Sequence, residues 1–186
     1  MPRIDPMDPP YAEDVGARLE AMMPPGVPPI LLFRTFARNL PMTDAMGPWG
    51  GYELSRRLSL SRRDRELVID RTCARCNCEY EWGVHVAFFA ERVGLTDAQV
   101  TSLTHGSPTD ACWTEVRDRV VLEVVDALHD SAGIDDDLWT RVSSLLSEAE
   151  LLDLLMLAGW YHAISFVANG VQLDLEAGAP RFVDVR

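Results

Sequence analysis

The segment from about Glu148 to Asn169 constrains the fold more than any other part of the sequence. Ser147 and Glu150 have the spacing of a helix-capping box, and the run that follows is apolar on nearly every side of a helix. Its apolar residues are Leu151, Leu152, Leu154, Leu155, Met156, Leu157 and Ala158. A helix without a polar face must be covered all round, so we expect it at the domain centre or in a subunit interface, with Gly170 ending it.

Helical patterns also account for most of the remaining chain. We expect helices over about residues 12–22, 30–39, 43–58, 78–93, 110–129 and 135–146, with further helices capped by Ser61 and Thr96. The stretch from Gly47 to Gly51 contains Pro48 and is predicted to divide the third of these. The sequence therefore predicts an all-α protein with a proline-rich arm at residues 1–29, one helical domain at 30–170 and an extended tail at 171–186.

Composition limits the kinds of partner. With 186 residues, 47% of them hydrophobic, the chain is long enough to bury one substantial core. A net charge of −12 argues against nucleic acid or an anionic membrane as the partner and favours a small molecule. All 17 basic residues are arginine, so no lysine is present for Schiff-base chemistry. The sequence has no signal-peptide pattern and no uninterrupted apolar run of about 18 residues, so we expect a soluble, cytoplasmic protein.

The stretch from Arg65 to His85 gathers most of the side chains that can carry chemistry. Asn77 separates two predicted helices, and Cys78, Glu81 and His85 share one face of the second. Glu66 faces the same way as Cys73 on the first helix. If the two faces meet, they form a pocket in which His85, held by Glu81, is a general base with a pKa of about 6.5. Glu66 also suits a purely structural role, because a carboxylate is stabilised in the first turn of a helix.

This stretch resembles the carboxymuconolactone decarboxylase and alkylhydroperoxidase D superfamily, whose peroxidase branch carries a Glu followed by Cys-x-x-Cys-x-x-x-His. With His85 on the motif histidine, Cys78 matches the first cysteine, Glu81 replaces the second, and Glu66 matches the proton-relay glutamate. The string Glu-Tyr-Glu-Trp-x-x-His at residues 79–85 is more similar to the decarboxylase-like branch. The segment at residues 159–182 also resembles this group.

The resemblance implies an all-α helical bundle of the alkylhydroperoxidase D type that assembles as a homo-oligomer, a trimer or a hexamer. It implies a carboxy-lyase of aromatic compound catabolism, acting on a small carboxylated lactone or keto acid without a cofactor. His85 would move the proton, and Glu66 and Glu81 would orient or relay it.

The remaining candidate residues surround these three. We expect Arg71 or Arg75 to hold a substrate carboxylate. Tyr80 and Trp82 are expected to form the wall of the binding site, although both side chains suit a core position equally well.

The cysteines leave an alternative open, a thiol-dependent peroxidase or disulfide reductase. In that case Cys78 attacks the peroxide, Glu66 and His85 relay the proton, and Cys76 or Cys73 resolves the sulfenic acid. Cys78 begins a predicted helix, whose dipole would favour the thiolate. A fold member without catalytic activity, serving as a scaffold, is a third possibility.

The same stretch contains metal-binding residue types. Cys73, Cys76, Cys78 and His85 could each ligate an ion, but three ligands within six positions lack the usual two-knuckle spacing of zinc sites. We therefore predict no metal in this stretch. Cys112 stands alone on a predicted helix and is expected to pack.

Overall fold

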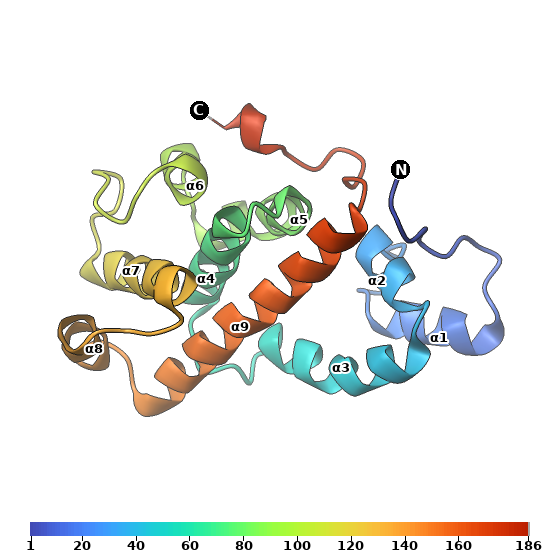
Figure 1. Ribbon diagram of the computed structural model, residues 1–186, viewed down its shortest axis with the longest axis horizontal. Helices are drawn as coiled ribbons and strands as arrows, with labels where there is room; N and C mark the ends of the chain where they lie inside the picture. The colour runs from blue at the N-terminus through green and yellow to red at the C-terminus, as the bar shows by residue number, and fades with distance from the viewer. Residues whose placement is uncertain (186) are drawn as a thin grey trace.

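The computed structural model describes residues 1–185, and within them it is a single all-helical domain without a strand (Figure 1). Arg186, the last residue of the predicted tail, lies outside the described residues. The α-helices are α1 (Glu13–Ala21), α2 (Leu31–Phe36), α3 (Leu40–Glu53), α4 (Arg62–Arg75), α5 (Glu79–Phe89), α6 (Asp97–His105), α7 (Val116–Ser131), α8 (Asp136–Ser143) and α9 (Glu148–Val171), with 3-10 turns at Glu91–Val93 and Phe182–Asp184.

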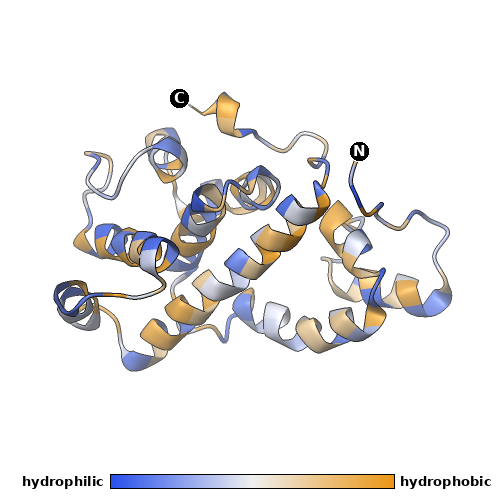
Figure 2. Ribbon diagram, in the orientation of Figure 1, coloured by the Kyte–Doolittle hydropathy of each residue, from blue (hydrophilic) through white to orange (hydrophobic). Residues whose placement is uncertain are grey.

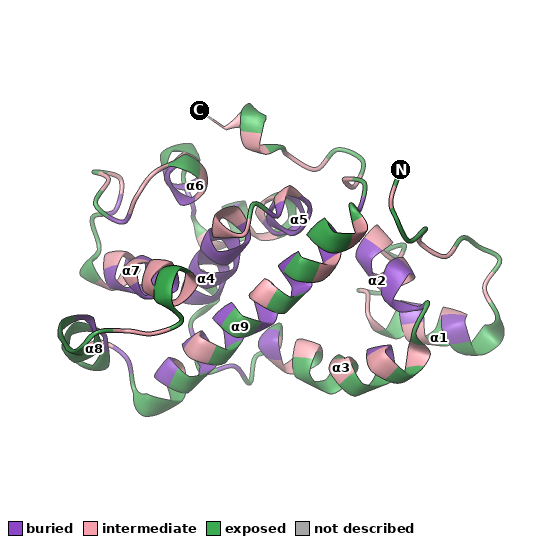
Figure 3. Cartoon of the chain, viewed as in Figure 1, coloured by how far each residue is buried: buried purple, intermediate pink, exposed green. Residues whose placement is uncertain are grey.

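Helix α4 forms the centre of the domain. Its apolar residues Leu67, Val68 and Ile69 are completely buried, and α5, α6, α7 and α9 pack around it (Figure 3). The helix also buries charged residues, among them Asp64 and Arg71. Arg117 on α7 binds Asp64 at 3.0 Å and Glu150 at 2.6 Å, so one guanidinium joins the first turns of α4 and α9 to α7. Asp64 is therefore neutralised by a partner on α7, and so is Arg71, which binds Asp126 of the same helix at 2.7 Å.

Helix α9 is covered on one side only. The side facing α4 is buried, whereas Leu152, Met156 and Phe166 are 65%, 50% and 69% exposed. Together with Gly159, Ala163 and Gly170, which are also exposed, they form one apolar stripe along the helix. Much of α9 is orange in Figure 2, as expected of a mainly hydrophobic helix. We call these six residues the α9 stripe. The expected complete cover is absent from the isolated chain.

Several predicted boundaries are confirmed. Thr96 with Gln99 and Ser147 with Glu150 form capping boxes at the starts of α6 and α9. Asn77 breaks the chain between α4 and α5 with a φ of 52°, and Gly94 ends the following turn with a φ of 70°.

Three predicted boundaries are wrong. Helix α3 runs through Pro48, because Trp49 packs against Trp160 of α9, with ring centroids 4.8 Å apart and ring planes tilted by 46°, and this contact favours the helical segment. Helix α7 starts at Val116 and not near Asp110, because the Asp110 carboxylate accepts hydrogen bonds from Ser102 and Ser107 and fixes a loop. Helix α9 ends at Val171, where Gln172 takes the left-handed conformation expected of Gly170.

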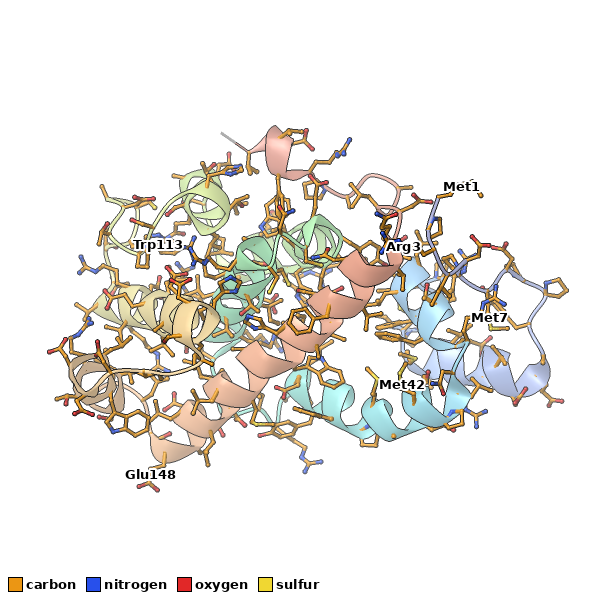
Figure 4. All side chains as sticks on the ribbon, in the orientation of Figure 1. Met1, Arg3, Met7, Met42, Trp113 and Glu148 are labelled. Carbon is orange, nitrogen blue, oxygen red and sulfur yellow. The ribbon has the colours of Figure 1, made fainter. Side chains whose placement is uncertain are left out.

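The N-terminal segment lies against the C-terminal end of α9, and the C-terminal tail lies against α5. Arg3 donates to the carbonyl oxygens of Gly170 and Val171 at 3.0 and 2.6 Å, and Figure 4 shows it beside the end of α9. The tail crosses α5, where the Phe182 amide donates to Glu79 at 2.8 Å. The tail thus covers the outer side of the helix that carries His85.

Helix α9 is the one helix in the described residues that is long and apolar enough to cross a membrane, judged by length and composition alone. Core helices of soluble proteins meet the same criterion, and one side of α9 packs on α4. Cytoplasmic localisation stays a prediction.

Candidate active site

The break at Asn77 folds α5 back along α4 and brings Glu66 against His85. The Nδ1 atom of His85 lies 2.8 Å from Oε2 of Glu66. Glu66 is completely buried and His85 is 3% exposed. The two helix faces therefore meet, and the catalytic roles assigned to these residues stay a prediction.

The other atoms of the pair have partners too. The Arg65 guanidinium donates to Oε1 of Glu66 at 2.7 Å. The Nε2 atom of His85 lies 3.0 Å from the Tyr161 hydroxyl of α9 and 3.5 Å from a carboxylate oxygen of Glu81. These contacts form one buried chain that runs from guanidinium to carboxylate, imidazole and phenol.

The buried pair is held in its charged form. Burial alone would lower the pKa of His85, but the charge and hydrogen bond of Glu66, with Glu81, raise that pKa to about 10. For Glu66, burial is likewise outweighed by His85 and Arg65, which lower the pKa of its carboxyl. A raised pKa favours the imidazolium at neutral pH, in contrast to the neutral imidazole that the sequence suggests. His85 then suits a proton donor better than a general base, and its catalytic role stays a prediction.

Two further carboxyl groups, those of Asp70 and Glu81, lie beside this series of buried contacts. Burial, followed by the charge of Glu66, raises the pKa of Asp70 well above its usual value. Among the described residues, neither oxygen of Asp70 has a hydrogen-bond partner, and one oxygen of Glu81 has none either. Buried polar atoms without partners are uncommon and often mark functional sites.

An arginine-lined pocket of about 440 Å³ lies beside the pair. Its described lining holds no acidic side chain but four arginines, Arg56, Arg62, Arg65 and Arg92. Two of the residues that line the pocket also contact the buried pair. Arg65 binds Glu66, and the ring of Phe89 lies 5.3 Å from that of His85. Arg65 and Phe89 thus connect the lining of the pocket to Glu66 and His85.

The structure places the predicted substrate-binding residues elsewhere. Arg71 is buried, with its donors taken by Asp126 at 2.7 Å and by three backbone carbonyls. Arg75 forms an ion pair with Asp130, which lies on α7 as Asp126 does. Both guanidiniums are committed to structural contacts, so neither fits the predicted carboxylate-binding role.

Tyr80 and Trp82 are core residues in the structure. The Tyr80 hydroxyl accepts from the Leu32 amide and donates to Glu176 at 2.6 Å. Trp82 is fully buried and its ring meets Phe182 edge-on. The two side chains thus anchor α2 and the tail to α5, and neither lines the arginine-lined pocket.

All four cysteines are free thiols. Cys73 and Cys78 are completely buried, and burial raises the pKa of Cys78 to about 11. Burial also raises the pKa of Cys73 and Cys76. The expectation that the helix dipole favours the Cys78 thiolate is therefore wrong, because desolvation outweighs it.

Sequence reasoning missed several residues of the site. Tyr161 and the pocket arginines are distant in sequence from the motif or lack its spacing, so no local rule points to them. Asp70 carried a signal, since it follows Glu66 by one helical turn and shares its face.

These observations describe an all-helical protein with a buried Glu66–His85 pair beside an arginine-lined pocket. The sequence model of the carboxymuconolactone decarboxylase family matches residues 42–122, which include Glu66, Cys78, Glu81 and His85. Over these residues the match confirms the resemblance to the carboxymuconolactone decarboxylase and alkylhydroperoxidase D superfamily that the sequence motif indicates.

Two solved structures have the same fold. One is an uncharacterized peroxidase-related protein from Silicibacter sp. TM1040, with a TM-score of 0.81 and 19% identity over 97% of this chain and 95% of that one. The other, from Agrobacterium tumefaciens, is of unknown function and proposed to be the antioxidant defence protein AhpD. It has a TM-score of 0.66 and 18% identity over 76% of this chain and 95% of that one. No curated protein matches the sequence.

Proposed function

We propose that the chain is a carboxy-lyase that removes CO2 from a small carboxylated lactone or keto acid. The observation that carries this proposal is the arginine-lined pocket, which shares Arg65 and Phe89 with the buried Glu66–His85 pair. Three of the four guanidiniums, those of Arg56, Arg62 and Arg92, form no ion pair among the described residues and favour a carboxylate ligand, since guanidinium binds carboxylate in a bidentate manner. The fourth, Arg65, already binds Glu66.

The chemistry needs a proton donor, and His85 supplies it. When the bond to the substrate carboxylate carbon breaks, CO2 leaves and the electron pair passes onto the adjacent carbon and its conjugated carbonyl. The imidazolium then donates its Nε2 proton to that carbon, directly or through the Tyr161 hydroxyl, and water restores the proton. Glu66 stabilises the charged histidine, and the arginines stabilise the developing negative charge. Because His85 is buried, Phe89 or Arg65 must shift to admit the substrate.

The first test is a screen of lactone acids and keto acids for CO2 release. For any substrate found, His85→Gln should lower kcat by about 100-fold or more, the usual contribution of general acid catalysis. The matched control is His105→Gln, because His105 is exposed, hydrogen-bonded to the Phe182 carbonyl and not part of the pocket lining, so this variant should leave kcat unchanged. Full activity of His85→Gln would refute the proton-donor role.

Pocket binding is tested separately. Arg56→Gln should raise KM about tenfold with little change in kcat, because an interaction made equally in ground and transition states affects binding alone. Arg57→Gln is the control, because Arg57 is the neighbouring exposed residue and does not line the pocket. Equal effects of the two variants would show that general charge, and not the pocket, binds the substrate.

The alternative is the thiol-dependent peroxidase that the peroxidase-related neighbour suggests. It requires a reactive thiolate, and burial opposes ionisation of Cys78. A brief pulse of organic hydroperoxide on the reduced protein, followed by a free-thiol count and intact mass, should therefore leave all four thiols. Loss of two thiols, prevented by Cys78→Ser, would establish the peroxidase instead.

A further inference from the structure

A second cluster of functional side chains lies on three different helices, outside the Glu66–His85 site. Cys76 caps the C-terminal end of α4, His129 lies in the last turn of α7 and His162 lies in the middle of α9. Their ligand atoms all lie within 4.8 Å of one another, although the residues are far apart in sequence. The packing of α7 and α9 on α4 therefore fixes the cluster.

The distances in the cluster are close to those of a metal site. His129 Nδ1 lies 3.1 Å from His162 Nε2 and 3.9 Å from Cys76 Sγ. In a tetrahedral zinc site with the usual bond lengths, two nitrogen ligands are about 3.3 Å apart and a nitrogen and a sulfur about 3.6 Å. Small side-chain shifts would bring all three atoms into coordination.

The orientation of His162 suits a ligand. Its Nδ1 lies 2.8 Å from the carbonyl oxygen of Ala158, which can only accept a hydrogen bond, so Nδ1 carries the proton. The lone pair of the neutral ring is then on Nε2, which faces His129 and Cys76. A backbone carbonyl that holds the other ring nitrogen is the usual second contact of a metal-binding histidine.

We propose that Cys76, His129 and His162 bind a divalent transition metal ion of the Zn²⁺ class, with one coordination position left for water or an added ligand. Two imidazoles and one thiolate are the ligand types that zinc takes, and among the described residues the cluster has no fourth protein ligand. All three side chains are half-buried, and Cys76 also lines a cleft of about 570 Å³ beside the tail. Of the four possible metal ligands in the sequence motif, Cys73, Cys76, Cys78 and His85, only Cys76 belongs to this cluster.

The test is titration of the reduced full-length protein with Zn²⁺, followed by calorimetry. We expect one equivalent to bind, and Mg²⁺ and Ca²⁺, which prefer oxygen ligands, not to bind at this site. Cys76→Ser, His129→Gln and His162→Gln should each weaken Zn²⁺ binding at least tenfold. Cys112→Ser and His105→Gln replace the same residue types outside the cluster and should leave the affinity unchanged.

Cobalt(II) gives a second measurement that does not depend on activity. The Co²⁺ protein should show tetrahedral ligand-field absorption with a thiolate charge-transfer band, and Cys76→Ser, which is nearly isosteric, should remove that band while circular dichroism stays unchanged. If no equivalent of Zn²⁺ binds, or if binding survives in both Cys76→Ser and His129→Gln, the contact between the two histidines is a plain hydrogen bond and the proposal is wrong.

Discussion

At the level of single residues, the proton on His85 makes the free energy of unfolding depend on pH. His85 is almost completely surrounded by protein, yet the Glu66 carboxylate 2.8 Å away keeps it charged. The folded state therefore holds a proton that the unfolded chain releases above a pKa of 6.5. This difference couples the stability of the fold to pH.

We predict that the contribution of His85 to stability is complete below pH 6.5 and is lost as the pH rises towards its folded pKa of about 10. Over that range the free energy of unfolding should fall by at most about 1.4 kcal/mol per pH unit from this residue. Urea unfolding at several pH values would measure it. His85→Gln should flatten the decline, whereas His105→Gln should keep it. An unchanged slope in His85→Gln would show that the histidine is neutral in the folded protein.

The residues of the site were predictable where the motif itself carried them. Glu66 and His85 could be paired from the register of two helices and the break at Asn77. Their charge state could not, because it depends on burial and on Arg65 and Tyr161, which only the tertiary structure brings into contact. The role of Arg71 could not be predicted either. Its place near the motif suggested a substrate contact, but the side chain is neutralised by Asp126 from another helix.

At the level of helices, the tail depends on a close approach to α5. A Cβ atom on Gly83 would lie 2.7 Å from the Pro180 carbonyl oxygen, which leaves no room for a side chain. Around this point Glu176 binds the Leu31 amide and the Tyr80 hydroxyl, and Phe182 packs on Trp82. The tail is thus held by a small number of contacts on either side of one glycine.

Gly83→Ala should therefore push the tail from α5 and lower the free energy of unfolding by about 1–3 kcal/mol, as overpacking in a tight contact does. Hydrogen exchange should become faster at residues 176–184. Gly51→Ala is the control, because a Cβ atom added to Gly51 would meet no atom within 4 Å, and it should stabilise α3 slightly. Similar exchange rates in the wild type and Gly83→Ala would contradict the close contact.

Helix existence was easier to predict than helix ends. The capping boxes at Thr96 and Ser147 are local signals and were confirmed. The continuity of α3 through Pro48 depends on the packing of Trp49 against Trp160, a contact between segments distant in sequence, and no local sequence rule predicts such a contact.

At the level of the whole molecule, the α9 stripe is the surface that an oligomer would use. Its large residues are at least half exposed, and its glycines and Ala163 would let a second backbone come close. A contiguous apolar surface of this kind is typical of an interface. The homo-oligomer expected from the sequence thus stays a prediction, with a specific face assigned to it.

We predict that light scattering of the wild type at micromolar concentration shows an oligomer and that Phe166→Glu is a monomer. Phe166 is 69% exposed, so the substitution should leave the fold of the single chain intact. Thr140→Glu, on the exposed side of α8, should remain oligomeric. A monomeric wild type would show that the α9 stripe is not an interface between copies of the chain.

The contrast between the arginine-lined pocket and the acidic chain has a kinetic consequence. At low ionic strength a molecule with a net charge of −12 repels an anionic substrate at long range, although four guanidiniums attract it at short range. Added salt screens the long-range repulsion first, since the screening length is about 10 Å at 0.1 M. Turnover of an anionic substrate at low concentration should therefore rise with moderate salt before it falls, the reverse of the behaviour of an enzyme that attracts its substrate from a distance.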